Sequence, residues 1–289
     1  MVTMRDVASE VGLSVTTVSR ALNNFEDVAE LTRLRIQEVA RRLDYHPNVM
    51  ARGLQTSRAN AIGLVIPPIL HLPYDAFWLE FIGGMSASCA HAGVDLLLSP
   101  VDAEEQMNQG FKRLIRGRRV DGLLICDVRR SDPRIAYLRK HELPFVAFGR
   151  TTGDLNYPYI DVDGAAGAMQ AMDHLVALGH RHIAYLGVDP DFSFSHFRLT
   201  GYRQALEQAG LQYDTRLVFE GLTGPMAAVT LASLLSSPNR PTAILVSADF
   251  LARETLKVAQ TLGISIPDDL SIIVFDDSLL VQQSDPPLT

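Results

Sequence analysis

The 289-residue sequence has only two cysteines and no long apolar run. Cys89 and Cys126 form no CxxC motif, which argues against a disulfide framework or a cysteine zinc site and agrees with a reducing compartment. No apolar stretch approaches the roughly 20 residues that a membrane-spanning helix needs. The N-terminus also lacks the apolar segment of a secretion signal. We therefore expect a cytoplasmic protein without membrane contact.

Motifs of nucleotide-dependent and hydrolytic enzymes are missing as well. The sequence contains no GxGxxG after its first predicted strand, no GxxxxGK[ST] and no GxSxG. The segment GHRH puts His180 and His182 at a helix–strand junction with no third ligand in view, so surface or packing roles are favoured over a metal site. We expect no catalytic residue, no cofactor and no metal.

The net charge of −7 argues against nucleic acid, but the charge is unevenly distributed. Residues 1–58 hold eight arginines against seven carboxylates, and the remaining residues hold 18 basic and 26 acidic side chains. Attraction to phosphate is screened beyond roughly 10 Å, so arginines that share one face suffice for DNA binding. The N-terminal segment therefore remains a candidate DNA-binding head.

The first 46 residues show the pattern of three short helices. Thr3-x-x-Asp6 resembles a capping box, Gly12 suits a helix end, and Ser14 can cap a second helix. Two short helices joined by a turn with glycine form the helix-turn-helix pattern. The apolar positions expected to close its core are Val7, Ala8, Val11, Val18, Ala21, Leu22, Ile36, Val39, Ala40 and Leu43.

In a helix-turn-helix unit the second helix enters the major groove, and its first turn meets base edges. Val15 can contact a thymine methyl, Thr16 can donate or accept a hydrogen bond, and Arg20 can donate two bonds to a guanine. The alternative is a three-helix bundle whose polar face is merely solvated. The face that would contact DNA comprises Val15, Thr16, Thr17, Ser19 and Arg20.

From residue 61 onward, apolar runs alternate with helix-patterned segments, which indicates parallel sheets covered on both faces. The predicted strands are 61–67, 95–100, 121–127, 144–149, 159–162, 182–188, 217–220, 242–247 and 271–276. The predicted helices are 77–92, 104–117, 132–141, 164–178, 197–209, 225–236 and 250–262. About nine strands exceed a comfortable single sheet, so we expect two, divided near Tyr159–Gly164.

Ligands of open α/β sheets bind beyond the carboxyl ends of the strands. Carboxylates, arginines and aromatic rings at these ends suit a polyol, because they bind hydroxyl pairs and stack on sugar C–H faces. Each Asp taken alone is more often a helix cap or a surface charge. The residues found there are Pro67, Asp127, Gly149, Arg150, Asp249, Asp276 and Asp277, with Phe77 and Trp78 opening the first helix of this region.

The motifs together resemble a LacI/GalR-family transcription regulator along essentially the whole chain. They are DVASEVGLSVTTVSRALN, YHPN, ARGL, IGLVIP, VDGLLI, HLVALGHRHIAYLG, FRLTGYRQAL, IPDDLSIIVFDD and DPPLT, in this order. A weaker similarity points to regulators of α-glucoside use. The resemblance implies a helix-turn-helix domain at 1–46, a hinge helix and linker at 47–60, and an effector-binding and dimerisation domain at 61–289, with subdomains of about 61–160 and 161–289 of periplasmic-binding-protein type.

The resemblance also assigns binding residues. The expected DNA-binding set is Thr3, Ser14, Val15, Thr16, Thr17, Ser19, Arg20, Asn23, Tyr45, Asn48, Ala51, Arg52 and Leu54, where Leu54 would wedge into the central base step. The expected effector-binding set is Phe77, Trp78, Asp127, Arg150, Arg198, Leu222, Asp249 and Asp276. Gly149, Ala248 and Leu222 depart from residue types common in the family, which leaves the ligand's identity open.

These features predict a homodimeric repressor that binds a pseudo-palindromic operator under control of a mono- or disaccharide. A solute-binding protein of the same two-lobed fold is the second hypothesis, and an α/β enzyme the third. Family members usually continue for about 45 residues past DPPLT, so we also expect a fragment with exposed sheet surface and reduced stability.

Overall fold

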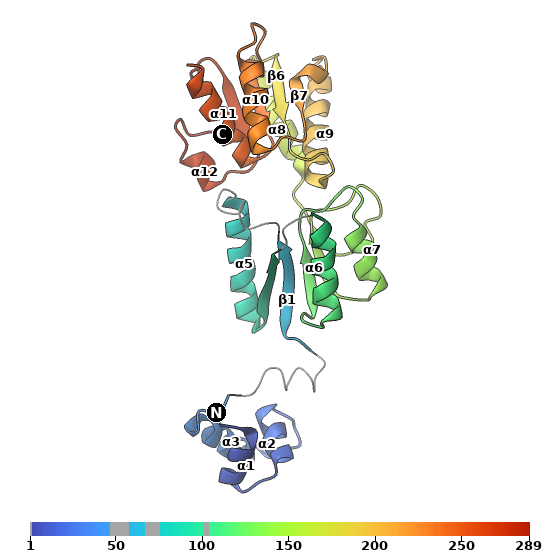
Figure 1. Ribbon diagram of the computed structural model, residues 1–289, viewed down its shortest axis with the longest axis vertical. Coiled ribbons are helices and arrows are strands. Elements are labelled where there is room, and N and C mark those ends of the chain that lie inside the picture. The colour runs from blue at the N-terminus through green and yellow to red at the C-terminus, as the bar shows by residue number, and fades with distance from the viewer. Residues whose placement is uncertain (1, 47–57, 67–75, 101–103) are drawn as a thin grey trace. The chain divides into compact units, whose positions relative to one another are not determined.

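The computed structural model describes residues 2–46, 58–66, 76–100 and 104–289 (Figure 1). The chain divides into two compact units, Met1–Ala59 and Asn60–Thr289. The predicted residues Asn48, Ala51, Arg52 and Leu54, and with them the hinge helix, lie outside the described residues, as does Pro67.

Residues 2–46, the part of the first unit described without a gap, form three helices, α1 (Met4–Val11), α2 (Val15–Leu22) and α3 (Glu30–Arg42). The predicted capping box is confirmed, because the Asp6 carboxylate accepts from the Thr3 backbone N–H at 2.8 Å. These bonds lower the pKa of Asp6. Gly12 ends α1 with φ of 72°, a left-handed conformation that glycine adopts without strain. The buried core comprises Val7, Ala8, Val11, Val18, Ala21, Val28, Ile36 and Ala40.

The second unit begins with a five-stranded parallel sheet in the order β2-β1-β3-β4-β5. Its strands are β1 (Ala61–Ile66), β2 (Asp95–Pro100), β3 (Gly122–Ile125), β4 (Phe145–Phe148) and β5 (Tyr159–Ile160), and its helices are α5 (Ala76–Ala92), α6 (Glu104–Arg116) and α7 (Pro133–Lys140). Figure 1 shows α5 on one side of the sheet and α6 on the other. We call this sheet and its helices the first lobe.

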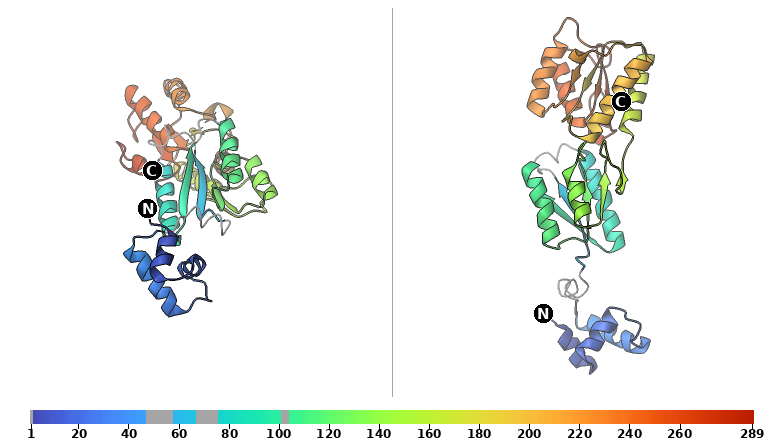
Figure 2. Two further views of the ribbon diagram at one scale, coloured as in Figure 1. Left: turned by 60° about the horizontal axis from the view of Figure 1, so that its bottom comes forward. Right: turned by 90° about the vertical axis from the view of Figure 1, so that its right-hand side faces the viewer.

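The second lobe is built on a four-stranded parallel sheet in the order β7-β6-β8-β9. Its elements are α8 (Gly164–Ala177), β6 (Ile183–Leu186), α9 (Ser193–Gln208), a 3-10 turn (Thr215–Leu217), β7 (Val218–Phe219), α10 (Gly224–Leu235), β8 (Ala243–Val246), α11 (Asp249–Thr261), β9 (Ser271–Val274) and α12 (Leu279–Gln282). Helices α8 and α9 cover one face and α10 and α11 the other (Figure 2). The strands β6 and β8 are buried on both faces, which explains their continuous apolar runs.

In the described part of the chain, nine strands in two sheets, with the change of sheet between β5 and α8, confirm the predicted architecture. Two details differ. Helix α9 begins at Ser193, four residues before the predicted start, and α12 was not predicted. The start of α9 carries no side-chain cap. Instead, the Ser193 backbone N–H and hydroxyl both donate to the Val128 carbonyl, at 2.8 and 2.7 Å. A tertiary contact therefore fixes this helix end, and local sequence does not signal it.

Candidate DNA-binding helix and effector site

Helix α2 presents the predicted DNA-binding face. Ser14 caps it by accepting from the Thr17 backbone N–H at 3.1 Å, and the two hydroxyls lie 2.8 Å apart. Val15 and Thr16 are exposed, whereas Thr17 is half-buried. The apolar face of the helix, which includes Val18, packs in the core. The first turn of α2 therefore exposes the short side chains of Val15 and Thr16 on a helix whose start is capped.

Arg20, in the last turn of α2, has a defined position. Its Nη2 lies 2.6 Å from Oδ2 of Asp27, and its Nε donates to Oδ1 of the same carboxylate at 3.1 Å. The guanidinium carbon lies 4.7 Å from the ring centroid of Phe25. The predicted base-contacting arginine is therefore oriented by the loop that follows its helix.

Of the other predicted DNA-binding residues in this unit, Thr3, Asn23 and Tyr45 flank helices, and Ser19 lies within α2. The Thr3 hydroxyl donates to Asp6 at 2.8 Å, and the Asn23 side-chain amide donates to the Ser19 carbonyl at 2.9 Å. Tyr45 is half-buried against the core, and burial raises the pKa of its hydroxyl. Ser19 is partly buried within α2. These contacts give Thr3 and Asn23 local structural roles in addition to any DNA contact.

In the second lobe, the guanidinium of Arg198 lies between two aromatic rings. Its central carbon is 5.0 Å from the centroid of Phe194 and 3.7 Å from that of Phe275. One nitrogen donates to the Ser247 carbonyl, and another donates to the Asp276 carboxylate at 3.2 Å. Burial lowers the pKa of Arg198, and the Asp276 charge acts in the opposite direction. Arg198 is thus fixed where β8 and β9 end.

Buried polar groups surround this arginine. Ser195 Oγ and Arg198 Nε have no hydrogen-bond partner among the residues that the structure describes. The Tyr185 hydroxyl lies 3.5 Å from the Ser195 carbonyl, and burial raises the pKa of Tyr185 to about 12. Asp249 opens α11, is 8% exposed, and its charge raises the pKa of Arg198. Buried polar groups without partners are costly and mark places where a ligand can supply the missing bonds.

Tyr185, Ser195 and Ser247 belong to this arrangement but were not predicted. Ser195 precedes Arg198 by three residues on α9, so both lie on one helix face, and this spacing could have identified it. Ser247 directly follows the apolar run of β8, in the position used to select Asp249. Tyr185 lies inside β6, where an aromatic residue carries no distinguishing signal.

Arg150 reaches the same helix from the first lobe. Its Nη1 lies 2.6 Å from Oδ2 of Asp161, and its guanidinium carbon lies 4.2 Å from the ring centroid of Phe197. Burial raises the pKa of Asp161, and Arg150 acts in the opposite direction. Since Phe197 and Arg198 are neighbours on α9, the structure brings Arg150, Arg198 and Asp276 to one end of this helix.

The lobes are also joined beside α9. Arg129 Nη1 lies 3.6 Å from carboxylate oxygens of both Asp189 and Asp191, and its guanidinium carbon lies 5.2 Å from the Phe192 ring centroid. The Arg130 backbone N–H donates to the Asp191 carbonyl at 2.8 Å. The loop after β3 and the loop after β6 therefore form one cross-linked strap.

Two members of the expected effector set are core residues in this structure. Trp78 is 5% exposed and packs with Leu64, Ile66 and Cys126, so its side chain belongs to the core of the first lobe. Leu222 is also 5% exposed and belongs to the core of the second lobe. Both side chains pack in a hydrophobic core, and their role in effector binding stays a prediction.

Phe77 and Asp127 remain candidates in the first lobe. Phe77 is half-buried, and its ring stacks on Phe81 at 5.4 Å and contacts Phe148 at 5.7 Å between centroids. Asp127 follows β3 with φ of 49°, and its carbonyl accepts from Arg134 at 2.9 Å. Phe77, Phe81 and Phe148 are partly buried and pack against the buried cluster of the first lobe that contains Trp78.

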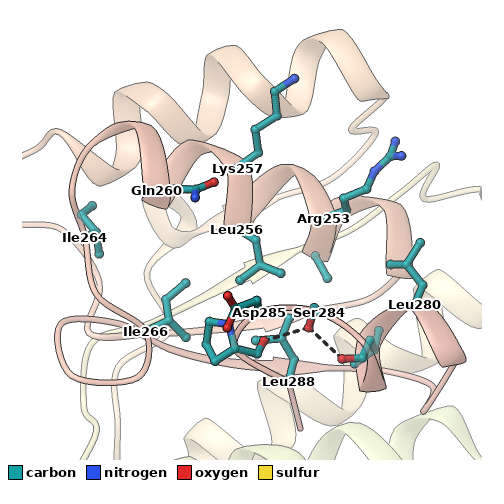
Figure 3. A pocket seen from close by; sticks show the side chains of 13 residues that line it. Arg253, Leu256, Lys257, Gln260, Ile264, Ile266, Leu280, Ser284, Asp285 and Leu288 are labelled. Carbon is teal, nitrogen blue, oxygen red and sulfur yellow. Dashed lines mark hydrogen bonds between the residues drawn. The ribbon is translucent and has the colours of Figure 1, made fainter.

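A cavity of about 460 Å³ lies elsewhere, between α11, α12 and the C-terminal residues (Figure 3). Leu256, Ile266 and Leu288 line it, while the Ser284 hydroxyl oxygen lies 2.7 and 2.8 Å from the carbonyl oxygens of Val281 and Pro286. None of the predicted effector residues lines this cavity.

The described part of the chain contains no group of three or more His, Cys, Asp or Glu residues arranged to hold a metal ion. The His180 ring nitrogens lie 2.9 and 3.0 Å from the hydroxyls of Thr242 and Ser271. Over the same described ranges, every helix is too short or too polar to cross a bilayer.

Comparison with known proteins agrees with this arrangement. A sequence profile of bacterial regulatory proteins of the lacI family matches residues 3–48, and a profile of the periplasmic binding protein-like domain matches residues 172–289. The HTH-type transcriptional regulator RafR of Escherichia coli is 36% identical over 275 residues, which are 94% of this chain and 81% of RafR. AglR of Rhizobium meliloti (strain 1021) is 35% identical over 280 residues, 96% of this chain and 78% of AglR.

Solved structures show the same fold. The lac repressor dimer bound to operator and the anti-inducer ONPF matches with a TM-score of 0.84 and 25% identity, covering 100% of this chain and 86% of that one. A complex of the transcriptional regulator CelR with cellobiose matches with a TM-score of 0.71 and 27% identity, at the same coverage.

The fold and the matches together define a helix-turn-helix transcription regulator with a periplasmic-binding-protein-like body. The chain belongs to the LacI family. Its relatives are transcription regulators, so the chain is a DNA-binding regulator rather than an enzyme or a solute-binding protein.

Proposed function

We propose that this regulator is controlled by a mono- or disaccharide bound around Arg198, Asp276 and Arg150. One observation carries the proposal: the Arg198 guanidinium lies between two rings, and its Nε and the buried Ser195 hydroxyl lack partners among the described residues. Sugar hydroxyls can supply both donors and acceptors to such groups, and the aromatic faces suit sugar C–H surfaces. The cellobiose complex of the similar regulator CelR supports this ligand class.

We further propose that the head at 1–46 binds half of a pseudo-palindromic operator in a homodimer, with 47–60 as hinge and 61–289 as effector domain. The effector would change the relative stability of two arrangements of the lobes, which it can do only through different affinities for them. The strap that joins Arg129 to Asp189 and Asp191 is the described element that such a change would alter.

A thermal-shift screen tests the ligand class. One saccharide in a panel of mono- and disaccharides should raise the melting temperature saturably. A ligand that binds only the folded state stabilises it by about 2.7 kcal/mol when its free concentration is 100 times Kd. For a protein of this size that corresponds to roughly 5–10 °C. Mannitol and sorbitol serve as acyclic controls. If no saccharide shifts the transition of protein that still binds operator DNA, the saccharide assignment is wrong.

Arg20→Ala tests the DNA-binding face. The substitution should weaken operator binding by about 1–3 kcal/mol, with the loss confined to one base position per half-site. The operator is first selected from a random DNA library, and gel shifts then compare single-base variants. An equal loss on every sequence would instead make Arg20 a phosphate contact.

A further inference from the structure

The loop between α2 and α3 holds Arg20 by two independent contacts. Asp27 accepts two hydrogen bonds along the Nε–Nη2 edge of the guanidinium, and the Phe25 ring covers one of its faces. Such a two-point pair with a carboxylate fixes the plane of the guanidinium as well as its place. A long arginine side chain without such partners samples many rotamers. Ordering it on DNA costs conformational entropy, which reduces the binding free energy gained from its base contacts.

The loop itself is anchored to the rest of the head. Arg33 on α3 donates to the Phe25 carbonyl at 2.8 Å and to the Val28 carbonyl at 3.2 Å. The Phe25 backbone N–H donates to the Arg20 carbonyl at 3.0 Å, and Val28 is buried in the core. Asp27 and Phe25 are therefore presented from a backbone that is tied to both α2 and α3.

Both contacts leave the guanidinium accessible. The side chains of Arg20 and Asp27 are 43% and 56% exposed, and Phe25 is 49% exposed. Because Asp27 takes one edge of the fork, the edge that includes Nη1 remains for O6 and N7 of a guanine. The geometry suits an arginine that is oriented before it meets DNA.

We propose that Asp27 and Phe25 are positioning residues for Arg20, so that discrimination at one base depends on two side chains that need not touch a base. The proposal rests on the proposed function in one respect, the contact of Arg20 with a guanine. Asp27 also places a negative charge beside the DNA-binding helix, which opposes phosphate binding on every sequence. Loss of Asp27 should therefore change discrimination and overall affinity in opposite directions.

The experiment uses the full chain and a random half-site DNA library, followed by sequencing of bound DNA at several protein concentrations. The variants are Arg20→Ala, Asp27→Asn and Phe25→Leu. Glu26→Gln is the matched control. Glu26 is exposed and directly precedes Asp27, so this substitution removes an equal negative charge from the neighbouring position. Circular dichroism checks that each head remains folded, which the exposure of all four side chains favours.

Arg20→Ala identifies the base position by removing its preference. Asp27→Asn should reduce the preference at the same position by about two- to fivefold, the range expected when an exposed ion pair is lost. Phe25→Leu should have an effect of similar size there. Both Asp27→Asn and Glu26→Gln should bind unrelated DNA slightly more tightly, but Glu26→Gln should keep the base preference. In the Arg20→Ala background, Asp27→Asn should cause no further change at that position.

The two hypotheses fail in different ways. If Arg20→Ala removes no base preference, the proposed contact of Arg20 with a base is wrong. If Arg20→Ala removes one and Asp27→Asn leaves it intact, the positioning role of Asp27 is overturned. The same conclusion follows if Glu26→Gln reduces the preference as much as Asp27→Asn does, because the effect is then general charge.

Discussion

Arg198→Ala is expected to abolish the response to the saccharide while leaving operator binding intact. The guanidinium occupies the space between Phe194 and Phe275 and donates to Asp276 and the Ser247 carbonyl. Removing one partner from a buried, charged hydrogen-bond arrangement costs about 2–5 kcal/mol of binding energy, or roughly 30-fold to several thousand-fold in affinity. The head that binds DNA is a separate compact unit, so its base contacts should persist.

Operator gel shifts with and without the saccharide found by thermal shift measure this effect. Arg203→Ala is the control, because Arg203 lies on the same helix, is exposed, and donates to the Tyr213 hydroxyl at 2.9 Å. The Arg203→Ala protein should bind the saccharide, and the saccharide should change its operator affinity as it does in the parent chain. Arg198→Lys keeps the charge but loses the planar fork, so an intermediate affinity is expected. A full saccharide response in Arg198→Ala would refute the proposed effector site.

The strand-end rule selected two carboxylates whose charges act on Arg198, because the rule depends only on topology. The carboxyl ends of neighbouring parallel strands meet at one edge, so Asp249 and Asp276 were selected without knowing any distance. The same rule cannot show what a side chain packs against. Trp78 and Leu222 were selected for their positions in the chain, but their side chains satisfy the core.

The arginines show a second limit of the sequence. Arg20 and Arg150 were predicted as ligands of DNA and effector, yet each has an intramolecular carboxylate partner, Asp27 and Asp161. The Arg20 partner lies seven residues away, beyond the end of α2 at Leu22, so no helix or strand face joins the two. Gly149 has φ of 106°, and a Cβ there would lie 3.2 Å from Cβ of Val128. Backbone conformation thus accounts for the glycine at this position, where the sequence departs from residue types common in the family.

Gly201→Ala should cause the largest loss of stability of any conservative change that we propose in the second lobe. Gly201 lies on α9 where that helix crosses α8, and a Cβ built there would be 2.2 Å from the Ala165 carbonyl oxygen. A backbone atom cannot move aside as a flexible side chain can, so the helices must separate. Overpacking of this kind costs about 1–3 kcal/mol and occasionally more, which for a chain of this size lowers the melting temperature by about 3–10 °C.

Separation of α8 and α9 should also disturb the effector site, because Arg198 stands one helical turn before Gly201 and Phe197 carries the contact with Arg150. We therefore expect Gly201→Ala to weaken saccharide binding as well as stability. Circular dichroism melts and the saccharide titration measure the two effects on the same protein. Gly224→Ala is the matched control, since a Cβ there would meet no atom within 4 Å at the start of α10. That substitution should leave the melting temperature unchanged or slightly raised. If the Gly201→Ala and Gly224→Ala proteins have the same melting temperature, the close approach of α8 and α9 does not limit stability. The hypothesis that this packing positions Arg198 is then wrong.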